Sequence, residues 1–215
     1  MLPVFKTLTQ GRRVILASGS PRRRQLLTGL GLDLEIIPST FEEDLEISSF
    51  LRAEDYVRQT AQEKAHDVLN SILRAQEVPK TDILVIGCDT VVVRGEAILE
   101  KPVTKDQAIS MLTMLSGNIH RVLTAVVFLH QRAPHDQDPH IHSFVEETTV
   151  HFGSLTQEEI AAYVETGEPM DKAGGYGYQG LAGCLIDRID GDYYNVVGMP
   201  LRRFYQECLK VLSLS

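Results

Sequence analysis

Residues 14–27 (VILASGSPRRRQLL) form the stretch best suited to bind an anion. Its apolar start predicts a short strand, followed by a tight turn. Ser20 suits the N-cap of the helix that follows, and Pro21 suits its first position. The free amides and the dipole at this end of the helix stabilise anions and disfavour cations. Arg22 and Arg23 in the first turn therefore suit the binding of a polyphosphate better than they suit the stability of the helix. A solvated basic helix start is the alternative interpretation, and neither GxxxxGK[ST] nor GxGxxG is present.

Two carboxylates are candidate ligands for a divalent metal. Glu43 lies in an acidic run, for which a solvated surface is the default interpretation. Asp89 and Thr90 follow the apolar run Ile83–Cys88, which predicts a buried strand ending where α/β proteins place ligands. Magnesium uses one or two carboxylates together with substrate phosphates, so Glu43 and Asp89 could hold it.

Further cations and an amide lie elsewhere in the chain. Lys64 falls within a predicted amphipathic helix, where it could also be an ordinary exposed lysine, and Lys101 follows a predicted hairpin. The glycine-rich residues 167–180 predict a loop that wraps a ligand, with Lys172 and Gln179 as its polar contacts. The lysines suit phosphates, and Gln179 suits the edge of a nucleobase.

Helices and strands must position these groups. Periodicity and capping residues predict helices over residues 21–28, 53–75, 105–115, 157–166 and 200–212. Strands are predicted over residues 14–17, 34–37, 83–88, 120–130 and 143–152, with hairpins pairing 91–93 with 97–99 and 184–189 with 193–197.

Composition narrows the class of protein. The length of 215 residues suits one large domain or two closely joined lobes. The formal net charge is −8. The negative charge argues against a nucleic-acid module or an anionic membrane as partner. A small anionic substrate is compatible with this net charge, because binding depends on the charges near the site more than on the total charge of the protein.

Cysteines and the amino terminus bear on the compartment. Cys88, Cys184 and Cys208 form no CxxC pair, which indicates reduced thiols. The start of the chain lacks an apolar signal run, and no stretch is long enough to span a bilayer, so we expect a cytoplasmic protein. The histidine-rich residues 131–142 have no metal-site spacing and are interpreted as a mobile hairpin tip.

Eight segments follow one another along the chain: ASGSPRR (17–23), the Glu42–Glu43 pair, EKA (63–65), CDT (88–90), EKP (100–102), LSG (115–117), GEPMDKAGGYGYQG (167–180) and NVVGMPL (195–201). Together they resemble the Maf family of nucleoside triphosphate pyrophosphatases. Cys88 and Tyr178 replace the alanine and small aliphatic residue commoner there.

This resemblance implies a mixed α/β fold of the Maf and inosine-triphosphatase type. Its features would be an elongated twisted sheet flanked by helices, two lobes with a central cleft, and a homodimer, with residues 1–215 as a single Maf-like domain. The reaction would be metal-dependent hydrolysis of dTTP and UTP to the monophosphate and pyrophosphate, with Mg²⁺ or Mn²⁺ as cofactor. Removal of non-standard pyrimidine nucleotides stays open. The chain also resembles the Maf portion of animal proteins fused to a methyltransferase-like domain.

The residues take the following expected roles. The substrate-binding groups are Ser20, Arg22, Arg23, Thr90, Lys172 and Gln179; Lys64 and Lys101 neutralise phosphate charge; Glu43 and Asp89 bind the metal. Asp89 is also the candidate to take the proton of the attacking water, and whether it is base or ligand is left open. A nucleotide-binding regulator without turnover is the alternative function, and it would not need the carboxylates.

Overall fold

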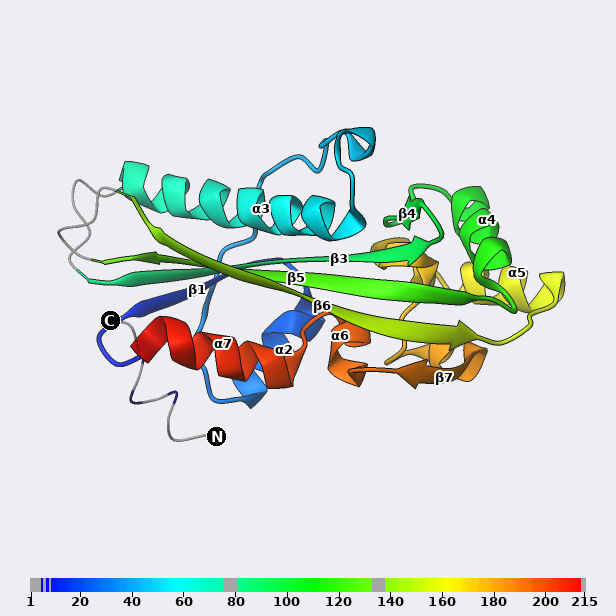
Figure 1. Ribbon diagram of the computed structural model, residues 1–215. Helices are drawn as coiled ribbons and strands as arrows, with labels where there is room; N and C mark the ends of the chain where they lie inside the picture. Colours follow the sequence, from blue (N-terminus) through cyan, green and yellow to red (C-terminus); the bar gives the residue numbers. More distant parts are fainter. Residues whose placement is uncertain (1–4, 6, 8, 76–80, 133–137, 214–215) are drawn as a thin grey trace. The chain divides into compact units, whose positions relative to one another are not determined.

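The computed structural model describes residues 5, 7, 9–75, 81–132 and 138–213 (Figure 1). Its contacts divide the chain into two compact units. Unit 1 comprises Met1–Asp89, Ala125–Val145 and Leu201–Ser215, and unit 2 comprises Thr90–Thr124 and Glu146–Pro200. The expected cleft between two lobes and the single-domain assignment stay predictions.

The strands form one mixed sheet in the order β2-β1-β3-β5-β6-β7, with β4 paired to β3. β1 is parallel to β2 and β3, whereas β4 is antiparallel to β3 and β7 to β6. The bounds are β1 Arg13–Ala17, β2 Glu35–Ile36, β3 Ile83–Arg94, β4 Ala97–Leu99, β5 Ile119–Gln131, β6 His140–Phe152 and β7 Ile186–Asp190. The expected mixed α/β class is confirmed.

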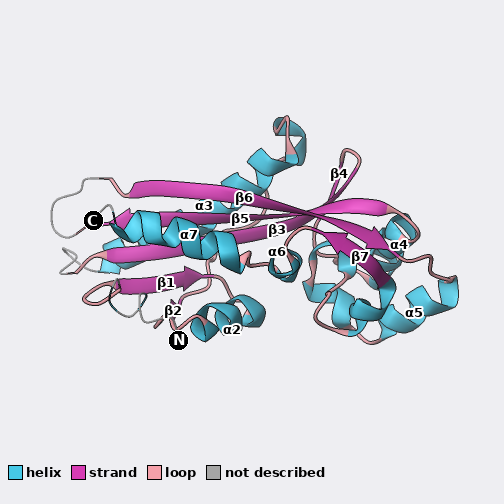
Figure 2. Ribbon diagram, turned by 60° about the horizontal axis from the view of Figure 1, so that its bottom comes forward, coloured by secondary structure: helices cyan, strands magenta, loops and turns pink. Residues whose placement is uncertain are grey.

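Helices of unit 1 cover both faces of its part of the sheet. α3 (Ala53–Ala75) lies on one face, while α2 (Pro21–Gly29) and α7 (Leu201–Ser213) lie on the other (Figures 1 and 2). Because both faces are covered, the residues of β1 after Arg13 and those of the first part of β3 are apolar, as the sequence predicted. A short 3₁₀ helix, η1 (Ile47–Ser49), precedes α3.

A glycine lets α3 approach β3 closely. A Cβ atom at Gly87 would lie 2.2 Å from the carbonyl oxygen of Ala61 and 2.8 Å from the Cβ of Ala65. Gly87 and Asp89 are two residues apart on the strand and so point to the same face. The close approach brings Lys64, the residue before Ala65 on α3, within reach of Asp89.

Unit 2 has its own core. Helices α4 (Lys105–Leu115) and α5 (Gln157–Glu165) pack with strand residues around buried side chains that include Val92, Leu112 and Phe152. The glycine-rich residues 167–180 contain the 3₁₀ helices η2 (Glu168–Asp171) and η3 (Ala173–Gly175), and a third, η4 (Leu181–Leu185), follows them. Gly174 has a φ of +67°, and a Cβ there would lie 2.7 Å from Val92, so only glycine fits.

Two sequence predictions are wrong. β3 does not end at Asp89: it continues to Arg94, because ladder pairing needs no apolar side chain and no glycine or proline interrupts the run there. Residues 193–197, predicted as a hairpin strand, form helix α6 (Tyr193–Val197). Asp192 caps that helix by accepting from the Tyr194 amide, and Gly198 ends it with a φ of 107°.

None of the described helices combines the length and apolar composition that a bilayer crossing needs.

Candidate functional site

The turn after β1 is built as the sequence predicted. The Ser20 side chain caps α2 by accepting from the Arg23 amide at 3.4 Å, and Pro21 opens the helix. The Ser20 amide donates to Ser18 Oγ at 3.3 Å. The half-buried Arg22 has no hydrogen bond or ion pair to any other residue that the structure describes. Its guanidinium is therefore available to an incoming anion.

Arg23 connects this turn to β3. One of its guanidinium nitrogens donates to Ser18 Oγ at 3.2 Å and to the Cys88 carbonyl oxygen at 3.0 Å. The residue after Cys88 is Asp89, so Arg23 fixes the turn against the strand segment that carries the candidate catalytic carboxylate. Burial raises the pKa of the Cys88 thiol to about 11, which makes it an unreactive packing group.

Lys64 joins the two predicted metal ligands. Its ammonium lies 2.7 Å from Asp89 Oδ1 and 3.0 Å from Glu43 Oε1. Lys64 is 9% exposed and Asp89 6% exposed. Charged side chains this buried are rarely found unless they are paired, and here one ammonium lies between two carboxylates.

Asp67, which the sequence analysis missed, fixes the segment that carries Glu43. Asp67 Oδ2 accepts from Ser39 Oγ and from the Thr40 amide, each at 2.7 Å. These hydrogen bonds, that from Ser39 foremost, hold the pKa of Asp67 below its usual value. Its position three residues after Lys64 on α3 places both on one helix face, and that spacing was the available signal.

The donor set of this cluster suits a divalent cation. Glu43 and Asp89 already hold a cationic group between them, and Mg²⁺ needs only one or two carboxylates when phosphate oxygens and water complete its shell. Within the described ranges, no three or more histidine, cysteine or acidic side chains are grouped to hold a metal. The protein alone would therefore supply a partial shell, completed by the substrate.

In unit 2, Thr90 belongs to a buried polar network. Its hydroxyl lies 3.0 Å from that of Thr124, which itself donates to the Asn195 carbonyl oxygen at 3.1 Å. Since Thr124 has one hydroxyl proton, Thr90 is the donor between the two threonines. The Asn195 amide donates to the Val122 carbonyl and to Thr148 Oγ1, both at 3.0 Å. The network fixes the Thr90 hydroxyl.

The three remaining predicted residues lie in unit 2 in different surroundings. Lys101 is exposed after β4. The ammonium of Lys172 donates to the Glu168 carbonyl oxygen at 2.6 Å and pairs with the Asp171 carboxylate, so it braces its own loop. Gln179 is exposed, and its side chain has no hydrogen-bond partner among the described residues.

Gln179 stands on a tight turn. The Gly180 amide donates to the Gly177 carbonyl oxygen at 2.9 Å, which makes Tyr178 and Gln179 the central residues. Before the turn, the buried Tyr176 hydroxyl lies 2.6 Å from His120 Nε2. Burial, with smaller effects from Arg94 and His151, lowers the pKa of His120 to about 4, so the ring is neutral at physiological pH.

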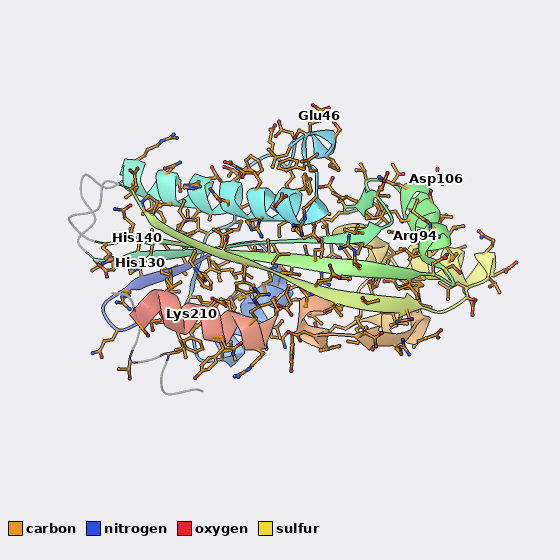
Figure 3. The ribbon with its side chains drawn as sticks, in the orientation of Figure 1. Glu46, Arg94, Asp106, His130, His140 and Lys210 are labelled. Atoms are coloured by element: carbon orange, nitrogen blue, oxygen red, sulfur yellow. The ribbon has the colours of Figure 1, made fainter. Side chains whose placement is uncertain are left out.

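The histidine-rich segment has other contacts. His130 and His140, labelled in Figure 3, come from the end of β5 and the start of β6. His140 Nε2 lies 3.0 Å from an Arg132 guanidinium nitrogen, and His142 pairs with Glu207 at 2.8 Å. Pro134 and His135 of the predicted hairpin tip lie outside the described residues.

The structure thus brings Glu43, Lys64 and Asp89 together in unit 1 and ties Arg23 to the residue before Asp89. Thr90, Lys101, Lys172 and Gln179 belong to unit 2. The functional role of each of these residues stays a prediction.

Comparison with known proteins gives the family. The model of the family described as "Maf-like protein" matches residues 13–211. A Geobacillus sp. protein named dTTP/UTP pyrophosphatase is 47% identical over 196 residues, covering 91% of this chain and 96% of the relative. A Homo sapiens protein named probable bifunctional dTTP/UTP pyrophosphatase/methyltransferase protein is 45% identical over 216 residues.

The lengths of these relatives differ. The match to the human protein covers 98% of this chain but only 34% of that relative, so the chain spans about a third of its length. Among solved structures, a nucleoside-triphosphatase / dITP/XTP pyrophosphatase from Mycobacterium abscessus aligns over 94% of this chain and 96% of its own. Its identity of 11% and TM-score of 0.39 are too low to bear on function. Because the family model spans nearly the whole chain and the Geobacillus relative matches end to end, the chain belongs to the Maf-like protein family.

Proposed function

We propose that this chain hydrolyses nucleoside triphosphates, preferentially dTTP and UTP, to the monophosphate and pyrophosphate. The observation that carries the proposal is the buried Lys64 ammonium, which lies between the carboxylates of Glu43 and Asp89. Asp89 belongs to β3, and Arg23 joins β3 to the turn before α2 by donating to the Cys88 carbonyl oxygen. The substrate preference rests on the Geobacillus and human relatives, whose names give dTTP and UTP.

The turn and its cations bind the phosphates. The Ser20-capped start of α2 offers amides to phosphate oxygens, and Arg22 adds a full charge beside them. Lys64 and Lys101 neutralise charge that develops on the phosphate oxygens during transfer. Arg23 keeps the turn in register with β3, because its guanidinium is bound to the Cys88 carbonyl.

Asp89 takes the proton. The oxygen of a water molecule attacks the α-phosphorus, and the bond from that phosphorus to the bridging oxygen of the β-phosphate breaks. Pyrophosphate leaves with the electron pair, and the Asp89 carboxylate accepts the proton of the attacking water. Lys64, 2.7 Å from Asp89 Oδ1, orients that carboxylate before the reaction.

Glu43 and Asp89 would also hold a divalent cation, Mg²⁺ or Mn²⁺. When bound, that cation neutralises phosphate charge and lowers the pKa of water. Lys64 lies between the same two carboxylates, so it must share or yield its position when the metal enters. Asp67 keeps the Glu43 segment in place through Ser39 and Thr40.

Base selection belongs to unit 2. The exposed Gln179 amide offers one donor and one acceptor, which match the N3–H and O4 edge of thymine and uracil. Thr90, fixed by Thr124, shares this task, because an amide alone could flip to suit cytosine. Lys172 keeps the loop compact.

The compartment and assembly are part of the proposal. We place the protein in the cytoplasm as a homodimer that binds neither nucleic acid nor membrane. Cys88, Cys184 and Cys208 are all unpaired thiols, which supports a reducing compartment. Light scattering coupled to size-exclusion chromatography tests the dimer, and a monomeric mass would reject it.

The deciding experiment is a screen of the common nucleoside triphosphates with and without MgCl₂. Anion-exchange chromatography of the products separates pyrophosphate from orthophosphate release. We expect monophosphate and pyrophosphate in equal amounts, with dTTP and UTP the best substrates. Asp89→Asn protein, purified in the same way, excludes a contaminating phosphatase. Release of orthophosphate from the γ position, or no turnover of any triphosphate, would overturn the proposal.

A further inference from the structure

The side chains of Glu168 and Tyr163 form hydrogen bonds with the backbone of the turn that carries Gln179 and of the residue after it. Glu168 Oε1 accepts the Tyr163 hydroxyl at 2.9 Å, and Glu168 Oε2 accepts the Leu181 amide at 3.0 Å. The Tyr163 oxygen in turn accepts the Gly177 amide at 3.3 Å. The turn is therefore held at the residue where it begins and at the residue just after it ends.

The carboxylate also fills the space beside the turn. A Cβ at Gly180 would lie 2.4 and 2.5 Å from the two Glu168 oxygens. The glycine thus leaves room for a carboxylate against the backbone, and the carboxylate leaves the turn little freedom to shift. The side chain of Gln179, the residue before, makes no hydrogen bond or ion pair with the described residues.

Burial and charge agree with this arrangement. Tyr163 is 5% exposed, and its burial, together with the bond to Glu168, raises the pKa of its hydroxyl, so it remains a donor. Although burial opposes ionisation of Glu168, the Leu181 amide and the Tyr163 hydroxyl hold its pKa below the usual value. An ionised carboxylate accepts from both partners at once.

We propose that Glu168 and Tyr163 are positioning residues for base selection: they hold the Gly177–Gly180 turn so that Gln179 presents its amide in one orientation. This inference rests on the proposed function and deepens it, since neither residue needs to touch the nucleotide. Discrimination between bases requires fixed polar groups, because a mobile amide adapts to the wrong partner. A loosened turn should therefore cost selectivity more than turnover.

Tyr163→Phe is the sharpest test, because it keeps the buried ring and removes only the hydroxyl shared by Glu168 and Gly177. We expect kcat/KM for dTTP to fall about tenfold through KM, and the preference for dTTP over CTP to shrink by a similar factor, as for loss of one or two hydrogen bonds. Glu168→Gln should act in the same direction. Tyr205→Phe on α7, whose hydroxyl has no partner in the described chain, is the matched control.

Hydrogen exchange supplies a readout that does not depend on activity. Amides of the peptide spanning 177–182 should exchange about tenfold faster in Tyr163→Phe, with peptides of α3 unchanged. Faster exchange with a reduced dTTP preference supports the proposal. An unchanged preference, or an equal loss for every substrate, overturns it. If the wild type releases no pyrophosphate, the proposed function fails separately, while exchange still reports whether the pair holds the turn. Should Glu168→Gln not fold, Tyr163→Phe decides alone.

Discussion

The two units offer different chemistry to a ligand. In unit 1 the candidate groups are charged and paired to one another: Lys64 bridges two carboxylates, and Arg23 is bound to the β3 backbone. In unit 2, Thr90 and Gln179 are uncharged and depend on hydrogen-bonded supports. Charge that is preorganised suits phosphoryl transfer, whereas fixed neutral donors and acceptors suit recognition of a base edge. Changes at Glu43, Lys64 and Asp89 in unit 1 should therefore affect turnover, and changes at Gln179 or its turn in unit 2 should affect selectivity.

Metal removal should have the largest effect. Glu43 and Asp89 offer only oxygen ligands, so activity should vanish after exhaustive EDTA treatment and return with Mg²⁺ or Mn²⁺. A zinc-selective chelator should leave the rate unchanged. The measurement is pyrophosphate release from dTTP under each condition. Full activity in metal-free buffer would show that the reaction needs no metal, and Lys64 would then be the cation between the two carboxylates.

Asp89→Asn should lower kcat about 100-fold or more, the scale expected for loss of a general base. The substitution keeps the shape of the side chain and an oxygen that can accept from Lys64, which retains its ion pair with Glu43, so the protein should still fold. Asp55→Asn on α3, where the half-exposed carboxylate pairs with Arg58, is the control for loss of a paired charge. A purified Asp89→Asn protein with near wild-type turnover would show that the charged cluster of unit 1 is structural.

Sequence reasoning located the elements well where local signals were strong. The capping serine and proline fixed the start of α2, and apolar periodicity placed α3 over the same residues that the structure shows. Asp192 was misjudged, because a cap before two tyrosines also resembles a hairpin turn. The uninterrupted course of β3 was missed because the polar pair Asp89–Thr90 was interpreted as a strand end.

The supports of the site could not be predicted. That Lys64 reaches Asp89 depends on the closeness of α3 to β3 at Gly87, which is a tertiary property. The contacts of Asp67 with Thr40 and of Glu168 with Leu181 join residues far apart in sequence through backbone amides. Every residue except proline has a backbone amide, so the sequence does not show which amide a given carboxylate will bind.

The buried His120 in unit 2 predicts a pH effect on stability. Burial lowers the pKa of His120 from 6.5 to about 4, so the unfolded chain binds its proton first as the pH falls. His120 should therefore reduce stability between pH 6.5 and 4, by about 2 kcal/mol from pH 7 to pH 5. Urea unfolding at both pH values, for wild type and His120→Gln, isolates this contribution. An equal pH dependence in both proteins would mean that His120 is charged in the folded state.

Gln179→Ala tests whether base selection depends on the glycine-rich loop of unit 2, and its expected effect is the smallest. Its amide complements the O4 and N3–H edge shared by thymine and uracil, and cytosine reverses that edge. We expect the wild type to prefer dTTP and UTP over CTP and purine triphosphates. In the variant the preference should shrink about tenfold, as when a polar group of a site is left without its complement.

The variant should separate selection from catalysis. Turnover of a poor substrate such as CTP should change little, because Gln179 takes no part in the charged cluster of unit 1. The measurement is kcat/KM for all common triphosphates in both proteins, with the exposed Gln157→Ala on α5 as control. A wild type that prefers a purine, or a variant with an unchanged order of preference, would remove base selection from the glycine-rich loop. The assignment of phosphate chemistry to Glu43, Lys64 and Asp89 would survive either result, because it depends on contacts within unit 1 alone.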